Sequence, residues 1–150
     1  KTSFDLAEQI KQVIFTNEWN WRNKDLAIDM ELPSTIISAD KNLLHQVWTN
    51  LITNSIKFNQ HGGSISLKIS SYEHEVEVEI QDTGIGISQA DLPQIFNRFY
   101  IVDKARNRNE SSSGLGLAIV KQIIELHNGQ INVSSHLGQG TKFIVSIPKK

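Results

Sequence analysis

The chain has 150 residues, 39% of them hydrophobic, which is enough for one core and too few for two ordinary domains. Its formal net charge of −1 and pI near 6.6 give no basic footprint for nucleic acid, and no run of Lys or Arg indicates direct contact with a membrane. Because it contains no cysteine, disulfides and thiolate metal sites are excluded.

The N-terminal segment predicts a helix over residues 5–17. Asp5 and Glu8 have the spacing of a capping box, in which the two side chains satisfy free amides of the first turn. We expect a hinge-like loop to follow this helix. It holds Trp19 and Trp21, which we interpret as packing residues because nothing nearby supplies an anion or metal partner.

Two short strands are expected next. Apolar residues alternate over positions 26–32, and Pro33 ends this pattern because proline cannot donate to a sheet. A short apolar run then covers positions 36–39. Asp40 follows at the place where a helix needs an N-terminal cap, so we expect a helix to begin there.

The segment NLITNSIKF in this helix carries the most informative pattern. Asn50, Asn54 and Lys57 are spaced by four and three residues, so on a helix they form one polar line spread over roughly 60°. An apolar stripe that includes Trp48 and Leu51 borders this line. Two carboxamides and an ammonium beside a core suit a hydrated divalent cation and phosphate oxygens. Two exposed asparagines and a solvated lysine would give the same spacing.

A hairpin of two strands is expected after this helix, over residues 64–70 and in the segment EVEVEIQD. Valine and isoleucine alternate inward along the second strand, and Asp82 continues the inward phase at its end. Gly84 and Gly86 then let the backbone turn close to a ligand. A buried carboxylate here would suit an amino-purine edge, and an aspartate that closes a β-turn is the alternative.

A second glycine pair, Gly114 and Gly116, precedes or opens a helix with an apolar pattern over positions 117–124 and a stop signal at 128–129. The N-terminus of a helix is a ready anion site. Neither glycine pair has the third glycine of G-x-G-x-x-G, and the chain has no G-K-[ST], so the dinucleotide-fold and P-loop interpretations fail.

A last strand is expected over positions 141–147, with Thr141 at the start of its inward row. Its hydroxyl could bond Asp82 or a water that bridges to a base. A β-branched residue that only favours strand geometry is the alternative.

Taken in this order, the segments resemble the catalytic ATP-binding domain of sensor histidine kinases, within the superfamily of gyrase, the mismatch-repair ATPases and a heat-shock chaperone. The resemblance spans nearly the whole chain. Its four boxes are ADKNLLHQVWTNLITNSIKF, DTGIGI, IFNRFY and GLGLAIVKQIIELHNG. It implies a single domain over residues 1–150 with an α/β (α+β) two-layer sandwich of the Bergerat type. We expect a mixed, mostly antiparallel sheet of about five strands with about three helices on one face.

The resemblance also implies which residues bind ATP and Mg²⁺. Asn54 would bind the metal directly, Asn50 would support the metal or its waters, and Lys57 would hold phosphate; these three form the implied catalytic set. Asp82 would accept from the adenine amino group. The other implied ATP-binding residues shape the pocket and its lid: Phe58, Gly84, Gly86, Ile87, Arg98, Phe99, Gly114, Leu115, Gly116, Leu117 and Thr141.

The polar segment between Phe99 and Gly114 corresponds to a loop that closes over ATP in the resembled family. The commonest form of that loop has an arginine directly after the Phe-Tyr pair, whereas Ile101 stands there in this chain. Arg98 or Arg106 is then the candidate for contact with the γ-phosphate. An ordinary solvated loop is the alternative for these basic residues.

The implied activity is transfer of the γ-phosphoryl group of Mg-ATP to a histidine on a helical dimerisation segment. None of the five histidines lies in an H-E-x-x-x-P setting, so we expect that segment elsewhere in a larger, homodimeric sensor kinase. We expect the chain to be a cytoplasmic domain of a membrane-anchored bacterial kinase, with a cognate response regulator as partner. An ATP-hydrolysing or ATP-sensing module of the same superfamily is the alternative. Such hydrolases carry a glutamate four residues before the metal-binding asparagine, where this chain has Asn50.

Overall fold

The structure is a computed structural model that describes residues 1–97 and 116–150. The strands are β1 (Thr2–Asp5), β2 (Ala27–Glu31), β3 (Ile36–Ala39), β4 (Ser64–Ser71), β5 (Glu75–Asp82), β6 (Gln130–His136) and β7 (Gly140–Pro148). The helices are α1 (Leu6–Thr16), α2 (Glu18–Asn23), α3 (Lys41–Lys57) and α4 (Gly116–Leu126), with a short 3-10 helix η1 (Leu92–Gln94).

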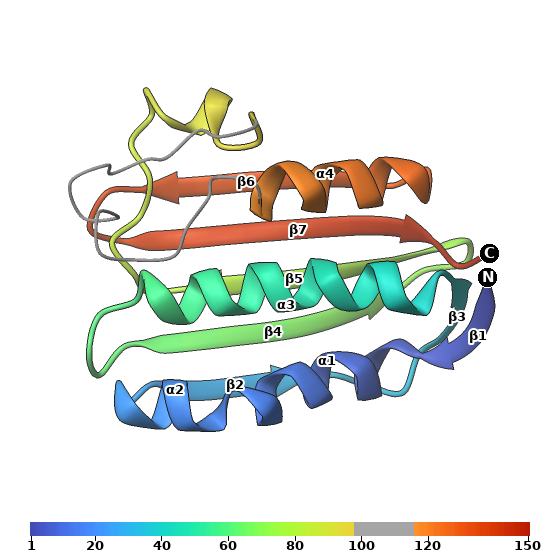
Figure 1. The fold of residues 1–150 in the computed structure, drawn as a ribbon, viewed down its shortest axis with the longest axis horizontal. Helices are drawn as coiled ribbons and strands as arrows, with labels where there is room; N and C mark the ends of the chain where they lie inside the picture. Colours follow the sequence, from blue (N-terminus) through green and yellow to red (C-terminus); the bar gives the residue numbers. More distant parts are fainter. Residues whose placement is uncertain (98–115) are drawn as a thin grey trace.

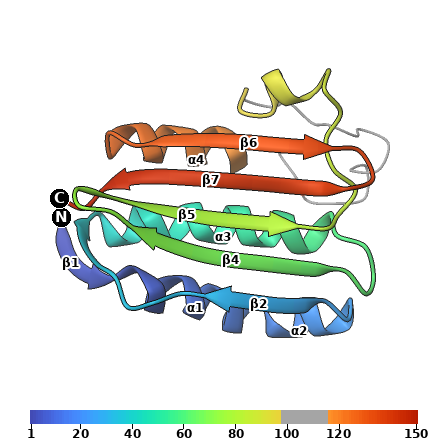
Figure 2. The ribbon, with the colours of Figure 1, turned by 180° about the vertical axis from the view of Figure 1, so that it is seen from behind.

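The five-stranded sheet has the order β2, β4, β5, β7, β6. β2 runs parallel to β4, and every other neighbouring pair is antiparallel. The helices α1, α3 and α4 cover one face of this sheet, and the opposite face is open (Figures 1 and 2). This arrangement confirms the predicted two-layer sandwich. In the described part of the chain, no helix is long and apolar enough to cross a membrane.

The central helix α3 and the central strand β5 end at the same edge of the molecule, opposite the two termini (Figure 1). α3 begins where predicted, because the Asp40 carboxylate accepts from the backbone N–H of Leu43 at 3.0 Å. Its apolar face is fully buried, as Trp48 and Leu51 show. β5 buries its alternate valines and isoleucine against this face. The core therefore lies between α3 and the sheet, and the polar ends of α3 and β5 lie at its edge.

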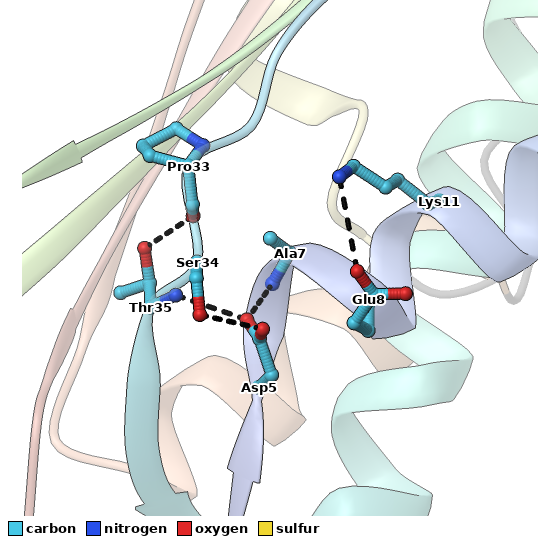
Figure 3. A network of polar contacts seen from close by, with 7 residues as sticks. All are labelled: Asp5, Ala7, Glu8, Lys11, Pro33, Ser34 and Thr35. Carbon is cyan, nitrogen blue, oxygen red and sulfur yellow. Dashed lines mark hydrogen bonds and ion pairs between the residues drawn. The ribbon is translucent and has the colours of Figure 1, made fainter.

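Asp5 caps the first helix and also ties it to the neighbouring loop (Figure 3). One carboxylate oxygen accepts from the backbone N–H groups of Ala7 at 3.0 Å and Thr35 at 2.9 Å, and the other accepts from the Ser34 hydroxyl at 2.8 Å. Glu8 does not complete a capping box in the described structure. Its carboxylate lies 3.8 Å from the ammonium of Lys11.

The predicted loop after the first helix is wrong, because residues 18–23 form the helix α2. Two contacts explain the helix: the Trp21 indole donates to the Ile14 carbonyl at 2.9 Å, and Arg22 pairs with Glu18 one turn earlier. Trp21 packs against the core as expected. Trp19 does not, since 74% of its surface is exposed.

The pairing of β1 with β3 is a further difference from the sequence prediction, which assigned no strand to residues 2–5. These two strands form a small antiparallel sheet of their own. A backbone bond from Ser38 to the carbonyl of Lys149 at 2.8 Å links this sheet to the C-terminal end of the chain. A four-residue strand whose partner lies so far along the sequence leaves little local signal.

Candidate functional site

Asp82 is buried at the end of β5, where only 8% of its surface is exposed. In the sheet it pairs with Ile65 of β4 on one side and with Thr141 of β7 on the other. Its Oδ1 atom accepts from the backbone N–H of Gly84 at 2.8 Å and of Thr141 at 3.2 Å. Burial raises the pKa of the Asp82 carboxyl, and these two amide donors oppose that rise.

Ser55 of α3 faces the same carboxylate. The side chain is 1% exposed, and its hydroxyl makes no hydrogen bond of ordinary geometry to any residue in the described ranges. It is nevertheless near enough to Asp82 to lower the pKa of that carboxyl slightly against the effect of burial. A buried hydroxyl without a well-formed hydrogen bond is less stable than a fully paired one, so a ligand or a water that completes its bonding is favoured here.

The sequence reasoning missed Ser55, although the signal for it was present. The residue lies four positions after Leu51 and three after Ile52, on the stripe that α3 buries. A polar side chain at such a position needs a partner, and the helical spacing alone would have identified it.

Two glycines let the DTGIGI segment approach neighbouring backbones closely. A Cβ on Gly84 would lie 2.5 Å from the carbonyl oxygen of Phe58, at the end of α3. Gly86 has a φ of 75°, and a Cβ there would lie 2.1 Å from the carbonyl oxygen of His136. Any larger residue would force these backbones apart. That these glycines shape a nucleotide pocket stays a prediction.

The hydroxyl of Thr141 does not bond Asp82, although its backbone amide does. Its Oγ1 atom lies 2.9 Å from the hydroxyl oxygen of Ser135 on β6. Ser135 in turn accepts from the backbone N–H of Ile87 at 2.7 Å and donates to the carbonyl of Gly140 at 2.7 Å. Ser135 was not predicted. It binds the end of the DTGIGI segment to the last hairpin.

The polar line of α3 is half-buried at Asn50, Asn54 and Lys57. The Asn50 amide donates to the carbonyl of Gly116, the first described residue of α4, at 3.5 Å. The Lys57 ammonium lies 5.4 Å from the ring centroid of Phe58, which is the C-terminal cap of α3. Within residues 1–97 and 116–150, the Asn54 carboxamide has no side-chain hydrogen bond, so its oxygen can accept a ligand such as a hard cation.

The remaining predicted site residues divide into two groups. Leu117 is half-buried and packs against the core at the start of α4. Four others lie outside the described residues: Arg98, Phe99, Gly114 and Leu115. The same holds for Ile101 and Arg106.

Chemically, the described residues combine an acceptor for an N–H group with a polar surface for anions and cations. Asp82 and Ser55 supply the buried acceptor and a hydroxyl. The half-buried polar line of α3 supplies two carboxamides and an ammonium on the same helix as Ser55. No three His, Asp or Glu side chains of the described ranges gather as a metal site.

Residues 39–150 match the sequence profile of the family described as histidine kinase-, DNA gyrase B- and HSP90-like ATPases. Over 128 residues the chain is 43% identical to the sensor protein SrrB of Staphylococcus aureus, an alignment that covers 83% of this chain and 22% of SrrB. The chain therefore spans about a fifth of the length of this relative.

Solved structures agree with this match over nearly the whole chain. The nucleotide-free catalytic domain of the histidine kinase ThkA superposes with a TM-score of 0.87 at 27% identity, covering 99% of this chain and 95% of that one. Full-length ShkA in complex with AMPPNP gives a TM-score of 0.82 at 28% identity, covering 98% of this chain and 30% of ShkA. ThkA in complex with the response regulator TrrA gives a TM-score of 0.80 at 28% identity, covering 99% of this chain and 42% of that one.

Proposed function

We infer the function from the family: the chain belongs to the histidine kinase-, DNA gyrase B- and HSP90-like ATPases, as the catalytic ATP-binding domain of a sensor histidine kinase. We propose that it binds Mg-ATP and transfers the γ-phosphoryl group to a histidine on a helical dimerisation segment. The observation that carries this proposal is the buried Asp82 carboxylate with the buried hydroxyl of Ser55 facing it.

The adenine end of the nucleotide fits this pair. Among the described residues, both amide donors reach the Oδ1 atom of Asp82, which leaves the Oδ2 atom to accept from the adenine amino group. The hydroxyl of Ser55 would bond the ring edge, directly or through a water. A guanine ring presents a carbonyl in place of that amino group, so acceptor would meet acceptor and guanine nucleotides would bind poorly.

The phosphate end fits the polar line of α3. Asn54 would bind Mg²⁺ through its carboxamide oxygen, Asn50 would support the metal or its waters, and Lys57 would hold phosphate. When bound, the metal would neutralise negative charge on the phosphate oxygens during phosphoryl transfer. The fit rests on donor chemistry, since Mg²⁺ prefers oxygen ligands and usually keeps several waters.

Transfer requires little covalent chemistry from the protein. An imidazole nitrogen attacks the γ-phosphorus, the bond from that phosphorus to the β,γ-bridging oxygen breaks, and ADP leaves with the electron pair. The phosphorylated imidazolium then gives its N–H proton to water. The chain's contribution is to hold the nucleotide still through Asp82 and Ser55, and to balance phosphate charge through Lys57.

Hydrolysis by the chain alone is disfavoured by Asn50. This residue lies one helical turn before Asn54, and its carboxamide donates to the Gly116 carbonyl. A carboxamide cannot take a proton from water at neutral pH. Activation of an attacking water would therefore need another base.

The proposal extends to the whole protein of which this chain would be a part. The alignment with 22% of SrrB supports a longer sensor kinase, with this domain on the cytoplasmic side of a membrane anchor. The ThkA complex with TrrA supports a cognate response regulator as the next phosphoryl acceptor. A homodimer would bring the phosphoacceptor helices together.

Phosphotransfer in trans tests the proposal. The chain is mixed with Mg²⁺, γ-labelled ATP and separately produced dimerisation segments of similar sensor kinases, and acid-labile phosphate on each segment is measured. We expect weak labelling, because the effective concentration that a covalent tether provides is lost. The control is the same segment with its histidine replaced by alanine. Rapid ATP hydrolysis that does not depend on any segment would favour the ATPase alternative.

A further inference from the structure

Lys24 lies at the end of α2, and its ammonium is surrounded by three backbone carbonyls from the C-terminal end of α3. The Nζ atom donates to the carbonyls of Ile56 at 2.9 Å, Lys57 at 2.7 Å and Asn59 at 3.3 Å. The side chain is half-buried. An ammonium has three N–H donors, so this arrangement uses a full set.

These carbonyls belong to the turn in which a helix leaves its last acceptors unsatisfied. The C-terminus of a helix also carries about half a negative charge from the aligned peptide dipoles. A cation at this end is therefore stabilising. Here it does not come from α3 itself but from a residue more than 30 positions earlier in the chain.

Backbone bonds tie the region of Lys24 to the turn at residues 61–63, which follows α3. Its own carbonyl accepts from the N–H of Gly62 at 2.8 Å, and the N–H of Ala27 donates to the carbonyl of Gly63 at 2.9 Å. The segment that joins α2 to β2 is therefore bound to the segment that leaves α3. The Lys24 side chain crosses between them.

The DTGIGI segment also binds the end of α3. The N–H of Ile85 donates to the carbonyl of Phe58 at 3.1 Å, and Gly84 packs closely on that carbonyl. The end of α3 is therefore bound both by the DTGIGI segment, which follows Asp82, and by the Lys24 ammonium.

We propose that Lys24 is a positioning residue for the phosphate-binding end of α3. It fixes the backbone that carries Lys57, and it neutralises the negative end of a helix that must receive a polyanion. This inference rests on the proposed binding of ATP by α3, and it adds a residue from outside the four sequence boxes. Because the Asp82 acceptor is held by the backbone N–H groups of Gly84 and Thr141, neither of which Lys24 contacts, we expect adenine recognition to depend little on Lys24.

The test compares ligands with and without phosphates. Lys24→Met keeps most of the aliphatic side chain and removes the charge and the donors. We expect its affinity for Mg-ATP to fall by about tenfold, the size of one charged hydrogen bond, while its affinity for adenosine changes less than about twofold. Lys24→Arg restores a charge and several donors, so we expect it to recover most of the lost ATP affinity.

Two control variants separate positioning from general destabilisation. Lys68→Met removes an exposed lysine from β4, and Val13→Ala opens the core under α1 without touching the end of α3. Calorimetric titrations are made with each variant that circular dichroism shows to be folded. Neither control should lose ATP affinity selectively. If Lys24→Met does not fold, Lys24→Gln, which keeps an amide donor without the charge, takes its place.

The outcomes distinguish this inference from the proposed function. An equal loss of ATP and adenosine affinity in Lys24→Met, or no loss of either, would overturn the positioning role. Loss of ATP affinity that Lys24→Arg does not recover would also overturn it. A parent chain that binds neither ligand would instead overturn the proposed function itself.

Discussion

The backbone amide of Thr141 on β7 donates to the Oδ1 atom of Asp82 on the neighbouring strand β5 at 3.2 Å. Gly84 donates to the same oxygen at 2.8 Å, so two backbone amides orient the carboxylate. Two elements far apart in sequence therefore present one buried acceptor. Its burial raises the pKa of Asp82, which makes ligand binding sensitive to pH.

The affinity for adenosine should fall as the pH falls through the raised pKa of Asp82 in the free protein. The adenine amino group donates to the ionised carboxylate, so the ligand favours the ionised form and lowers this pKa. Below the pKa of Asp82 in the ligand-free protein, the carboxyl must lose its proton before adenosine binds. The affinity for adenosine therefore declines by at most about tenfold per pH unit in that range. Adenosine is used because the phosphates of ATP titrate as well.

Asp5→Asn provides the control for this pH profile. It removes a titrating carboxyl at the opposite end of the molecule and should leave the dependence of adenosine affinity on pH as in the parent. An affinity that stays constant or rises as the solution becomes more acidic would contradict the role of Asp82.

Ser55→Ala should change stability and affinity in opposite directions. Removal of a buried hydroxyl that lacks a partner should stabilise the ligand-free chain by up to about 1 kcal/mol, and loss of a ligand contact should weaken adenosine by about threefold to tenfold. Urea unfolding and calorimetry measure the two effects. The exposed Ser134→Ala on β6 is the matched control. Lower stability with unchanged adenosine affinity would show that the hydroxyl serves the fold alone.

Asn54→Ala should abolish most of the dependence of ATP binding on Mg²⁺, because the metal tolerates few ligand losses. Lys57→Ala on the same helix should instead weaken ATP more than adenosine while keeping a magnesium enhancement. Titrations of ATP with and without the metal separate the two roles. An Asn54→Ala chain that retains the full enhancement would mean that the metal is bound elsewhere.

Asp5→Ala should destabilise the chain by about 1 kcal/mol at neutral pH through loss of the helix cap. The N–H of Thr35 is the main cause that lowers the pKa of Asp5, with smaller contributions from Ser34 and Ala7. A lowered folded pKa means that the stabilisation is present above the unfolded pKa and is lost as the pH falls through the folded one. Urea unfolding at neutral pH and in strong acid should therefore show a difference from the parent that vanishes in acid.

Local patterns in the sequence predicted the elements that carry the site. The helical spacing of Asn50, Asn54 and Lys57 and the alternation that ends at Asp82 are both properties of a few neighbouring residues, and the structure confirms the helix and the strand. The helix α2 was missed because it depends on contacts such as the indole of Trp21 on the Ile14 carbonyl.

Residues that act across the fold left no comparable pattern. Lys24 bonds carbonyls more than 30 positions away, and Ser135 bonds Ile87 across 48 positions. The Thr141 hydroxyl was predicted to bond Asp82 or a water that bridges to a base, with a residue that only favours strand geometry as the alternative. In the structure the contact with Asp82 is made by the Thr141 amide, which every residue type other than proline would provide. Such contacts depend on how elements meet, and single-sequence periodicity carries no information about that.

The most direct measurement is the calorimetric titration of the parent and Asp82→Asn with Mg-ATP and Mg-GTP. Asparagine keeps an oxygen for the amides of Gly84 and Thr141, so the fold should persist, while its amide group faces the adenine amino group donor to donor. We predict that the parent prefers ATP to GTP and that Asp82→Asn weakens ATP by roughly 1–3 kcal/mol. Equal affinities of the parent for the two nucleotides, or full ATP affinity in a folded Asp82→Asn chain, would contradict the assignment of this site to adenine.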